Sequence, residues 1–201
     1  MTMRRMILGW LAMLAMLAPA VADARWSTRR PAESYKVASS TMTVVPDIAW
    51  NRWSHRDTSY TEKWTLDGLG LNELAFIGRL KDGKTLFKQP NRRYDPLPKF
   101  RSNMLPTDIV ELFETSARIV LKSSMFETTT AEPATFAGQP GVRFDYKYTI
   151  QDEEVVRNGE AYAAIVNGRL YLMSFEAPAI YYFERDRDRF RRLVATAQII
   201  K

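Results

Sequence analysis

The chain has 201 residues, with 29 Lys and Arg against 23 Asp and Glu, one His and no Cys. That length suits one domain, and the composition excludes collagen-like, low-complexity and strongly disordered chains. The absence of Cys excludes disulfide frameworks, thiolate zinc sites and thiol chemistry. The formal net charge of +6 is modest, and the sequence contains no block of five residues of like charge. This charge distribution argues against a nucleic-acid-binding arm, and the modest net charge allows at most weak contact with anionic surfaces.

The first 24 residues have the layout of a secretory signal peptide. Arg4 and Arg5 precede the apolar stretch Met6–Leu17, and Ala22 and Ala24 are small residues of the kind that a signal peptidase reads. An apolar run of about 12 residues rises only about 18 Å as a helix, too short for a hydrocarbon core of about 30 Å. We expect cleavage after residue 24, no transmembrane segment afterwards, and a periplasmic or secreted protein.

The first half of the remaining chain reads as short strands joined by polar segments. Its residues 25–35 are polar and basic and predict a flexible tail. A single domain follows over residues 36–201. Its expected elements are strands at 36–45, 62–66, 71–80 and 84–87, an aromatic loop at 50–61, and an extended excursion at 89–106 that is rich in Pro.

A helix is predicted immediately after the excursion. Its apolar residues recur with a period of 3.6: Ile109, Leu112, Phe113, Ala117, Val120 and Leu121. Asp108 and Glu111 resemble a capping box at its start, and Arg118 and Lys122 lie near its end, where the helix dipole favours cations.

The second half predicts an antiparallel meander that ends in a helix. In the segment 142–150, apolar and polar residues alternate, which is typical of a strand with one face in water. Strands at 155–166 and 169–177 flank Asn167-Gly168, a dipeptide suited to a type I′ hairpin turn. An amphipathic helix from about 181 to 197 closes the chain. The order of elements predicts an α+β fold, a mostly antiparallel sheet with helices packed on it.

The sequence from Thr135 to Ile199 resembles the Mog1/PsbP-like fold. It contains "TFAGQPGVRFDYKYTI", then "RNGEAYAAIVNGRLYLMSFEAP", then the helix "YYFERDRDRFRRLVATAQII", with Leu170-Tyr171 and Ala177 at the positions of that fold's hairpin pattern. The resemblance implies an α/β/α sandwich and an accessory or binding role, because members of that fold are mainly not enzymes. It assigns no functional residue here.

Two surfaces are candidates for contact with a partner. The first is the segment that interleaves aromatic and basic side chains: Trp50, Arg52, Trp53, His55 and Arg56. The tryptophans contribute to binding only if they are exposed, and the alternative is that they plug the core. The second is the polar face of the meander, formed by Arg143, Asp145 and Lys147.

The sequence shows no catalytic or metal-binding motif. His55 is the only histidine, which excludes a metal site built from several histidines. The sequence also contains no Gly-x-Ser-x-Gly elbow that would present a serine nucleophile to His55. Gly68-x-Gly70 lacks a third glycine, and the consecutive acids Asp152, Glu153 and Glu154 read as a solvated turn rather than a calcium loop. The arginines at the end of the chain, interspersed with acids, predict a solvated, salt-bridged helix face. We predict no metal and no cofactor.

These observations favour an exported, non-enzymatic accessory or binding module that docks an unknown protein or envelope component. Two alternatives stay open. One is a carboxylate-dependent hydrolase of an envelope glycan, for which Glu160 and Glu176 are expected to face each other across a hairpin. The other is a carrier of a small hydrophobic ligand, which needs a cavity of about 300 Å³ or more between sheet and helix.

Overall fold

The computed structural model describes residues 25–90, 96–123, 125–150 and 154–200, so the predicted signal peptide and residues Asp152 and Glu153 lie outside the described residues. The helices are α1 (Pro106–Leu121) and α2 (Tyr182–Ala195). The strands are β1 (Trp26–Arg29), β2 (Tyr35–Lys36), β3 (Met42–Val44), β4 (Trp50–Trp53), β5 (Thr61–Thr65), β6 (Glu73–Leu80), β7 (Met125–Phe136), β8 (Gln139–Thr149), β9 (Val156–Val166), β10 (Arg169–Pro178) and β11 (Gln198–Ile199).

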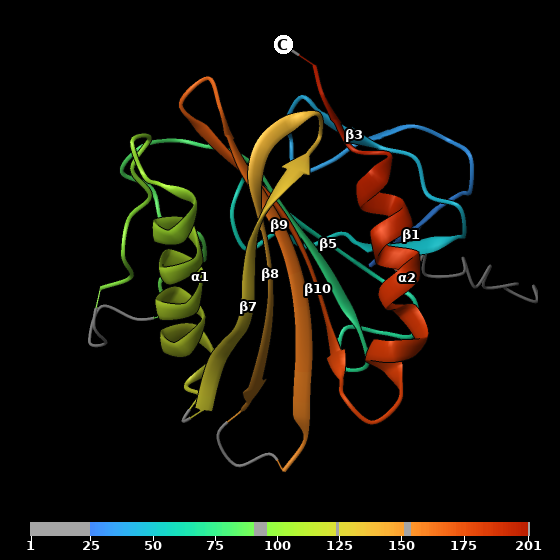
Figure 1. Cartoon of the computed structure of the whole chain (residues 1–201). Coiled ribbons are helices and arrows are strands. Elements are labelled where there is room, and N and C mark those ends of the chain that lie inside the picture. Colours follow the sequence, from blue (N-terminus) through green and yellow to red (C-terminus); the bar gives the residue numbers. More distant parts are fainter. Residues whose placement is uncertain (1–24, 91–95, 124, 151–153, 201) are drawn as a thin grey trace, which may run out of the picture.

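One large antiparallel sheet organises the molecule, in the order β1-β4-β5-β6-β10-β9-β8-β7. The two helices lie on opposite sides of this sheet, α1 on one face and α2 on the other (Figure 1). A small sheet, β11-β3-β2, joins the chain's last strand to its early strands. The predicted α+β class, a mostly antiparallel sheet with helices packed on it, is confirmed. Neither helix among the described residues is long and apolar enough to cross a membrane.

Helix α1 begins three residues earlier than the capping pattern predicts. Leu105 is its N-cap, Pro106 occupies the first turn, and the Asp108 carboxylate accepts a hydrogen bond from the Leu105 backbone N–H at 2.8 Å. Asp108 is therefore the third residue of the first turn and not the cap, and the predicted pairing with Glu111 is wrong. Proline explains the shift, because its missing N–H is one that the first turn leaves unpaired anyway.

The hairpins of the second half follow the prediction closely. Asn167 and Gly168 have φ values of 51° and 69° between β9 and β10, as a type I′ turn requires. Strand β7, which pairs with β8 along its whole length, was not expected. It is an edge strand with mostly exposed side chains and an internal Pro133, so it shows little hydrophobic alternation.

The first half differs more from expectation. Residues 25–35, predicted as a flexible tail, contain β1, which pairs with β4 over four residues, and the start of β2. The tail prediction is wrong because β4, which lies within the predicted loop 50–61, supplies the backbone hydrogen bonds that hold β1 in the sheet. The predicted strand at 36–45 is split into β2 and β3, and the segment at 84–87 forms only one bridge, Thr85 to Lys99.

Two hydrophobic clusters lie on the two faces of the large sheet. The cluster under α2 contains Trp50, Trp64, Phe175 and Phe190. The cluster under α1 contains Phe113, Phe126, Phe144, Tyr146 and Tyr148, among others. Successive strand residues alternate between these clusters, so both faces of the central strands are buried.

An ion cluster fastens α2 to the sheet. Glu160 on β9 is fully buried, and its carboxylate accepts hydrogen bonds from Arg143 on β8 at 3.1 Å, from Arg187 on α2 at 2.6 Å and from Arg191 on α2 at 3.0 Å. Asp145 pairs with Arg143 and Arg187 at the rim of this cluster. We call these five residues the Glu160 cluster.

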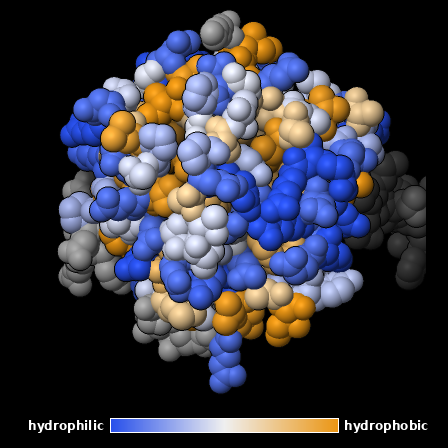
Figure 2. Space-filling model, viewed as in Figure 1, coloured by the Kyte–Doolittle hydropathy of each residue, from blue (hydrophilic) through white to orange (hydrophobic). Residues whose placement is uncertain are grey.

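The Glu160 cluster corrects two predictions. The face carrying Arg143 and Asp145 is not a wet docking surface, because α2 covers it and their side chains are only 16% and 18% exposed. The arginines of α2 are also not merely solvated, since Arg187 and Arg191 reach inward to Glu160. The outer surface over α2 is still mostly hydrophilic (Figure 2).

The arginines determine the ionisation of Glu160. Burial alone would raise the pKa of this carboxyl, but hydrogen bonds from Arg191, Arg187 and Arg143 outweigh burial and lower the pKa from 4.5 to about 2. The folded state therefore gains stability from ionised Glu160 that is complete above about pH 4.5 and is lost as the pH falls towards about 2.

The substitution Glu160→Gln tests the cluster. Removing the charge leaves arginines facing each other without their shared carboxylate, and we expect the free energy of unfolding at pH 7, measured with urea, to fall by about 3 kcal/mol. The deficit relative to the natural protein should shrink as the pH is lowered from about 5 to about 3, where the natural protein begins to lose the same interaction.

Lys147→Gln is the matched control on the same sheet. Lys147 forms an exposed pair with Glu127 at 3.0 Å, and its loss should cost less than about 1 kcal/mol. Equal effects of the two substitutions, or a deficit in Glu160→Gln that does not depend on pH, would contradict the assigned role of Glu160.

Candidate functional site

The predicted aromatic and basic loop does not form one exposed surface. The Trp50 side chain is fully buried and packs edge-on against Phe175, with ring centroids 6.4 Å apart. This excludes Trp50 as a contact residue, because its side chain completes the core under α2. Trp53 is half-buried against Trp26, and His55 is exposed.

The basic residues of the same loop are directed to a buried carboxylate. Arg52 and Arg56 each donate a hydrogen bond at 2.9 Å to Glu62, which is 2% exposed. Trp64 donates a further hydrogen bond to the same carboxylate at 2.9 Å. Arg52 and Arg56 therefore neutralise an internal charge rather than present a basic surface. Of the five predicted contact residues in this loop, only Trp53 and His55 keep a surface position of their own.

Glu160 and Glu176 lie on opposite faces of the sheet, so the expected pair does not exist. Phe175 is the residue directly opposite Glu160, and Glu176 is the next along β10. Neighbouring strand residues point to opposite faces. Glu160 therefore faces α2, while Glu176 faces α1. The true cross-strand partner of Glu176 on β6 is Glu73.

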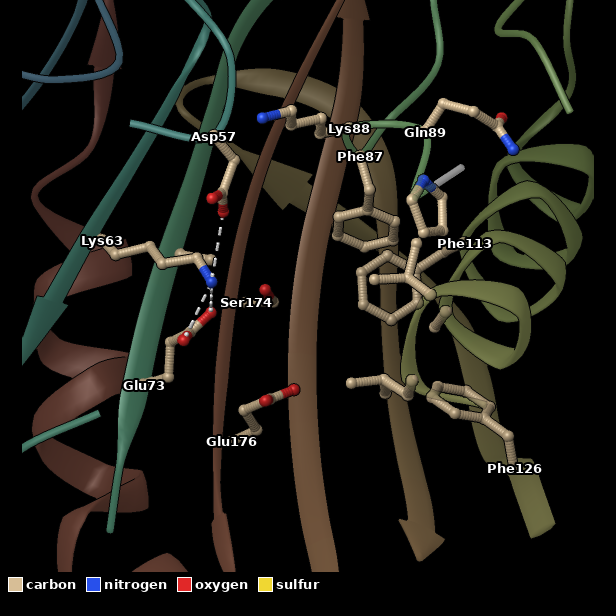
Figure 3. A pocket seen from close by; sticks show the side chains of 15 residues that line it. Asp57, Lys63, Glu73, Phe87, Lys88, Gln89, Phe113, Phe126, Ser174 and Glu176 are labelled. Carbon is tan, nitrogen blue, oxygen red and sulfur yellow. Dashed lines mark hydrogen bonds and ion pairs between the residues drawn. The ribbon is translucent and has the colours of Figure 1, made fainter. Parts of the chain in front are cut away.

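A cavity of about 380 Å³ lies between α1 and the sheet, and we call it the α1 cavity. One side is apolar and lies along α1 and the segment before it (Figure 3). The other side carries polar side chains of β5, β6 and β10, and Asp57, Lys88 and Gln89 add further polar groups from outside these strands. The apolar lining is Ala75, Phe87, Pro90, Phe113, Ala117, Val120, Leu121 and Phe126, and the polar lining is Asp57, Lys63, Glu73, Lys88, Gln89, Ser174 and Glu176.

A row of residues across four strands positions the polar side. Tyr146, Gly159, Glu176 and Glu73 are register partners on β8, β9, β10 and β6. A Cβ at Gly159 would meet the Tyr146 ring at 2.1 Å, so only glycine lets this ring lie across β9. Tyr146 then donates a hydrogen bond to Glu176 at 3.1 Å, and Tyr148 donates another at 2.7 Å.

Lys63 is the cation held on the polar side. Its ammonium lies 2.9 Å from Glu73 and 3.4 Å from Asp57, as the dashed lines in Figure 3 show. Burial acts to lower the pKa of Lys63, but Glu73 and Asp57 outweigh it and raise the pKa above its ordinary value. Lys63 therefore stays charged at neutral pH.

Glu73 is the carboxyl whose ionisation changes near neutral pH. Burial raises its pKa, Lys63 lowers it, and the facing Glu176 raises it again, with a net increase from 4.5 to about 7. Burial and the same Glu176 carboxylate also raise the pKa of Tyr146 and Tyr148, so both phenols remain hydrogen-bond donors. The polar side thus has more carboxyl groups than cations, and one of them is half-protonated near pH 7.

This arrangement can accept hydrogen bonds from a bound polar group or neutralise a cation, while the α1 side holds an apolar group. Among the described residues, no group of three or more His, Asp or Glu side chains is arranged to hold a metal ion. The ionisable groups that line the α1 cavity are carboxyl and ammonium groups.

Glu176 is a candidate from the sequence, whereas Glu73, Lys63 and the apolar wall are not. The alternation in β6 places Glu73, Ala75 and Ile77 on one face, which is a usable signal. What the sequence does not show is the register that sets Glu73 opposite Glu176. The two residues are far apart in the chain, and a shift by one residue would separate their side chains.

Comparisons with known proteins identify a fold and no family. No protein-family model matches the chain, and no curated protein matches it. Among solved structures, the Ran-binding protein Mog1p of Saccharomyces cerevisiae is similar, with a TM-score of 0.50 at 8% identity over 86% of this chain and 97% of that one.

Two other solved structures have lower scores. PsbP (CyanoP) from the cyanobacterium Synechocystis has a TM-score of 0.45 at 16% identity, over 88% of this chain and 83% of that one. LpqN of Mycobacterium tuberculosis, a protein involved in cell envelope biogenesis, has a TM-score of 0.35 at 9% identity, over 89% and 94%. At such identities the likeness concerns the fold alone: the chain has the Mog1/PsbP-like fold that its second half resembles.

Proposed function

We propose that this protein is a binding module that holds one small amphipathic ligand in the α1 cavity. The observation that carries the proposal is the cavity itself. It has about 380 Å³ between sheet and helix, an apolar wall on α1, and carboxyl groups on the opposite wall. Ligand sites in proteins are typically mostly apolar pockets of this size with a few polar groups that fix orientation.

The polar wall indicates the chemistry of the ligand's head. Asp57, Glu73 and Glu176 outnumber Lys63 among the charged groups there, and Lys88 lines the cavity from the segment near Phe87. An anionic head would face repulsion from these carboxylates, whereas an amine or hydroxyl would donate hydrogen bonds to them. We therefore expect an apolar body of modest length with a cationic or hydrogen-bond-donating head.

This proposal refines the expected docking module. Half of the eight residues predicted to carry docking are engaged internally, in the Glu160 cluster or on Glu62, and Trp50 is buried as well. The proposed location outside the inner membrane rests on the signal-peptide layout of residues 1–24 and on that layout alone.

The facing carboxyls favour one second candidate, hydrolysis of an envelope glycan. Glu73 and Glu176 are directly opposite each other, and a pKa of about 7 suits Glu73 to act as a general acid. Release of reducing sugar from a purified envelope glycan, lost in both Glu73→Gln and Glu176→Gln, would assign hydrolysis. Ligand binding with no such release would assign the binding module.

Filling the α1 cavity should abolish binding without unfolding the protein. Val120 is half-buried on the cavity side of α1, and Val120→Trp places an indole in the space. We expect the fluorescence titration of N-phenyl-1-naphthylamine to show at least tenfold weaker binding, with a thermal midpoint within a few degrees of the natural protein. Thr115→Trp, on the exposed side of the same helix, is the control and should bind normally. Equal binding by both variants would contradict the assignment of the cavity.

The head-group preference should depend on pH through Glu73. Octylamine, octanol and octanoate share one chain, and we expect them to displace the probe in that order of affinity at pH 8. Because Glu73 ionises as the pH rises through about 7, the affinity for the octylammonium ion should rise by about tenfold, or about 1.4 kcal/mol, between pH 6 and pH 8.

The variant Glu73→Gln separates this effect from a general one. It keeps the size of the side chain and removes its titration, so octylamine binding should become almost independent of pH over the same range. A preference for octanoate, or an unchanged pH dependence in Glu73→Gln, would show that the carboxyl wall does not recognise the head group.

A further inference from the structure

A second hollow, of about 720 Å³, lies beside the α1 cavity and shares Phe87 and Lys88 with it. Its charged lining consists only of cations, which come from the end of β6, the segment after it and the start of β10. They are Arg79, Lys81, Lys84, Lys88 and Arg169. We call this hollow the basic groove.

None of these five cations forms an ion pair with another described residue of the chain. The nearest acid in sequence, Asp82, accepts hydrogen bonds from Arg101 and from the Ser102 backbone. The arginines of α2 differ sharply, since each of them is paired with a carboxylate. The positive charge of the basic groove is thus not balanced by the groups that line it.

The backbone presents one of these cations through a strained bulge. Leu80 pairs with Leu170 and Ile77 pairs with Leu172, so Gly78 and Arg79 both lie opposite Tyr171. Arg79 has a φ of +55°, in the left-handed region that residues other than Gly and Asn seldom adopt. A bulge of this kind redirects a side chain out of the regular alternation, and strain of this kind gathers at functional sites.

Hydroxyl groups complete the lining of the groove. Ser39, Thr58, Ser59, Tyr60 and Thr85 line the hollow beside the cations, and Arg169 is partly exposed. The hydroxyls of Thr58, Tyr60 and Thr85 already donate hydrogen bonds within the chain, to Thr61, to the Thr85 carbonyl and to the Phe87 carbonyl. Guanidinium and ammonium groups are the donors from which phosphate oxygens accept hydrogen bonds most readily. Five positive charges in one concave site match an anion with several negative charges better than a single carboxylate.

We propose that the basic groove binds a small ligand carrying two or more phosphate groups. This site is separate from the carboxyl wall of the α1 cavity, and the proposal does not rest on the proposed function. Inorganic pyrophosphate is the simplest probe of it. We expect saturable binding at low ionic strength, measured by isothermal titration calorimetry, and weaker binding as sodium chloride is raised.

A paired comparison of charge variants tests the location. Arg79→Asn with Arg169→Gln removes two groove cations, and asparagine tolerates the backbone at position 79. Arg25→Gln with Arg30→Gln removes the same charge from exposed residues outside the groove. The first pair should weaken pyrophosphate binding at least tenfold and the second less than twofold. Equal weakening by both pairs would overturn the proposal, because it would show a response to net charge alone.

Arg79→Gly adds a readout that a purely structural role would not give. Glycine relieves the positive φ, so the thermal midpoint should rise or stay level while pyrophosphate affinity falls. A rise in stability with unchanged affinity would remove Arg79 from the site. Vesicles containing phosphatidylglycerol test the other source of phosphate: binding to them without binding to pyrophosphate would contradict a site for a small ligand.

Discussion

The burial of carboxylates beneath arginines is the interaction on which the α2 side of this protein depends. Glu160, Glu62 and Asp186 are at most 2% exposed, and each accepts hydrogen bonds from at least two arginines. An unpaired buried carboxylate would cost several kcal/mol, so these arginines cannot leave without destabilising the fold. Because these arginines are paired with buried carboxylates, a strongly charged helix can cover one face of the sheet. The same pairing makes these basic side chains unavailable for a docking surface.

The α1 side follows a different rule. Its carboxyl groups, Glu73 and Glu176, are balanced by one lysine and by two tyrosine hydroxyls rather than by arginines. Gly159 makes this possible, because its missing side chain leaves room for the Tyr146 ring. The result is a carboxyl pair that stays accessible from a cavity instead of being sealed in an ion cluster. This contrast between the two faces supports the placement of ligand binding beneath α1, where the cavity lies.

The sequence predicts local features of this fold well and long-range register poorly. The alternation in β8, the Asn167-Gly168 turn and the apolar periodicity of α1 depend on neighbouring residues, and each is seen in the structure. The sequence does not predict β1 and β7, because their stability comes from partner strands and not from their own polar sequences. The same limit applies to the site. Glu176 is a candidate from the sequence, but Glu160 is the wrong partner for it, since only the pairing of β6 with β10 brings Glu73 beside Glu176.

The central claim is that an amphipathic molecule lies in the α1 cavity with its head at the carboxyl wall. Nuclear Overhauser contacts between bound octylamine and the protein test this most directly. The account predicts contacts from the chain methylenes to the rings of Phe113 and Phe126, and from the methylene next to nitrogen to the side chains of Glu73 and Glu176. Contacts confined to the basic groove or to the surface around Trp53, or the reversed orientation, would contradict it.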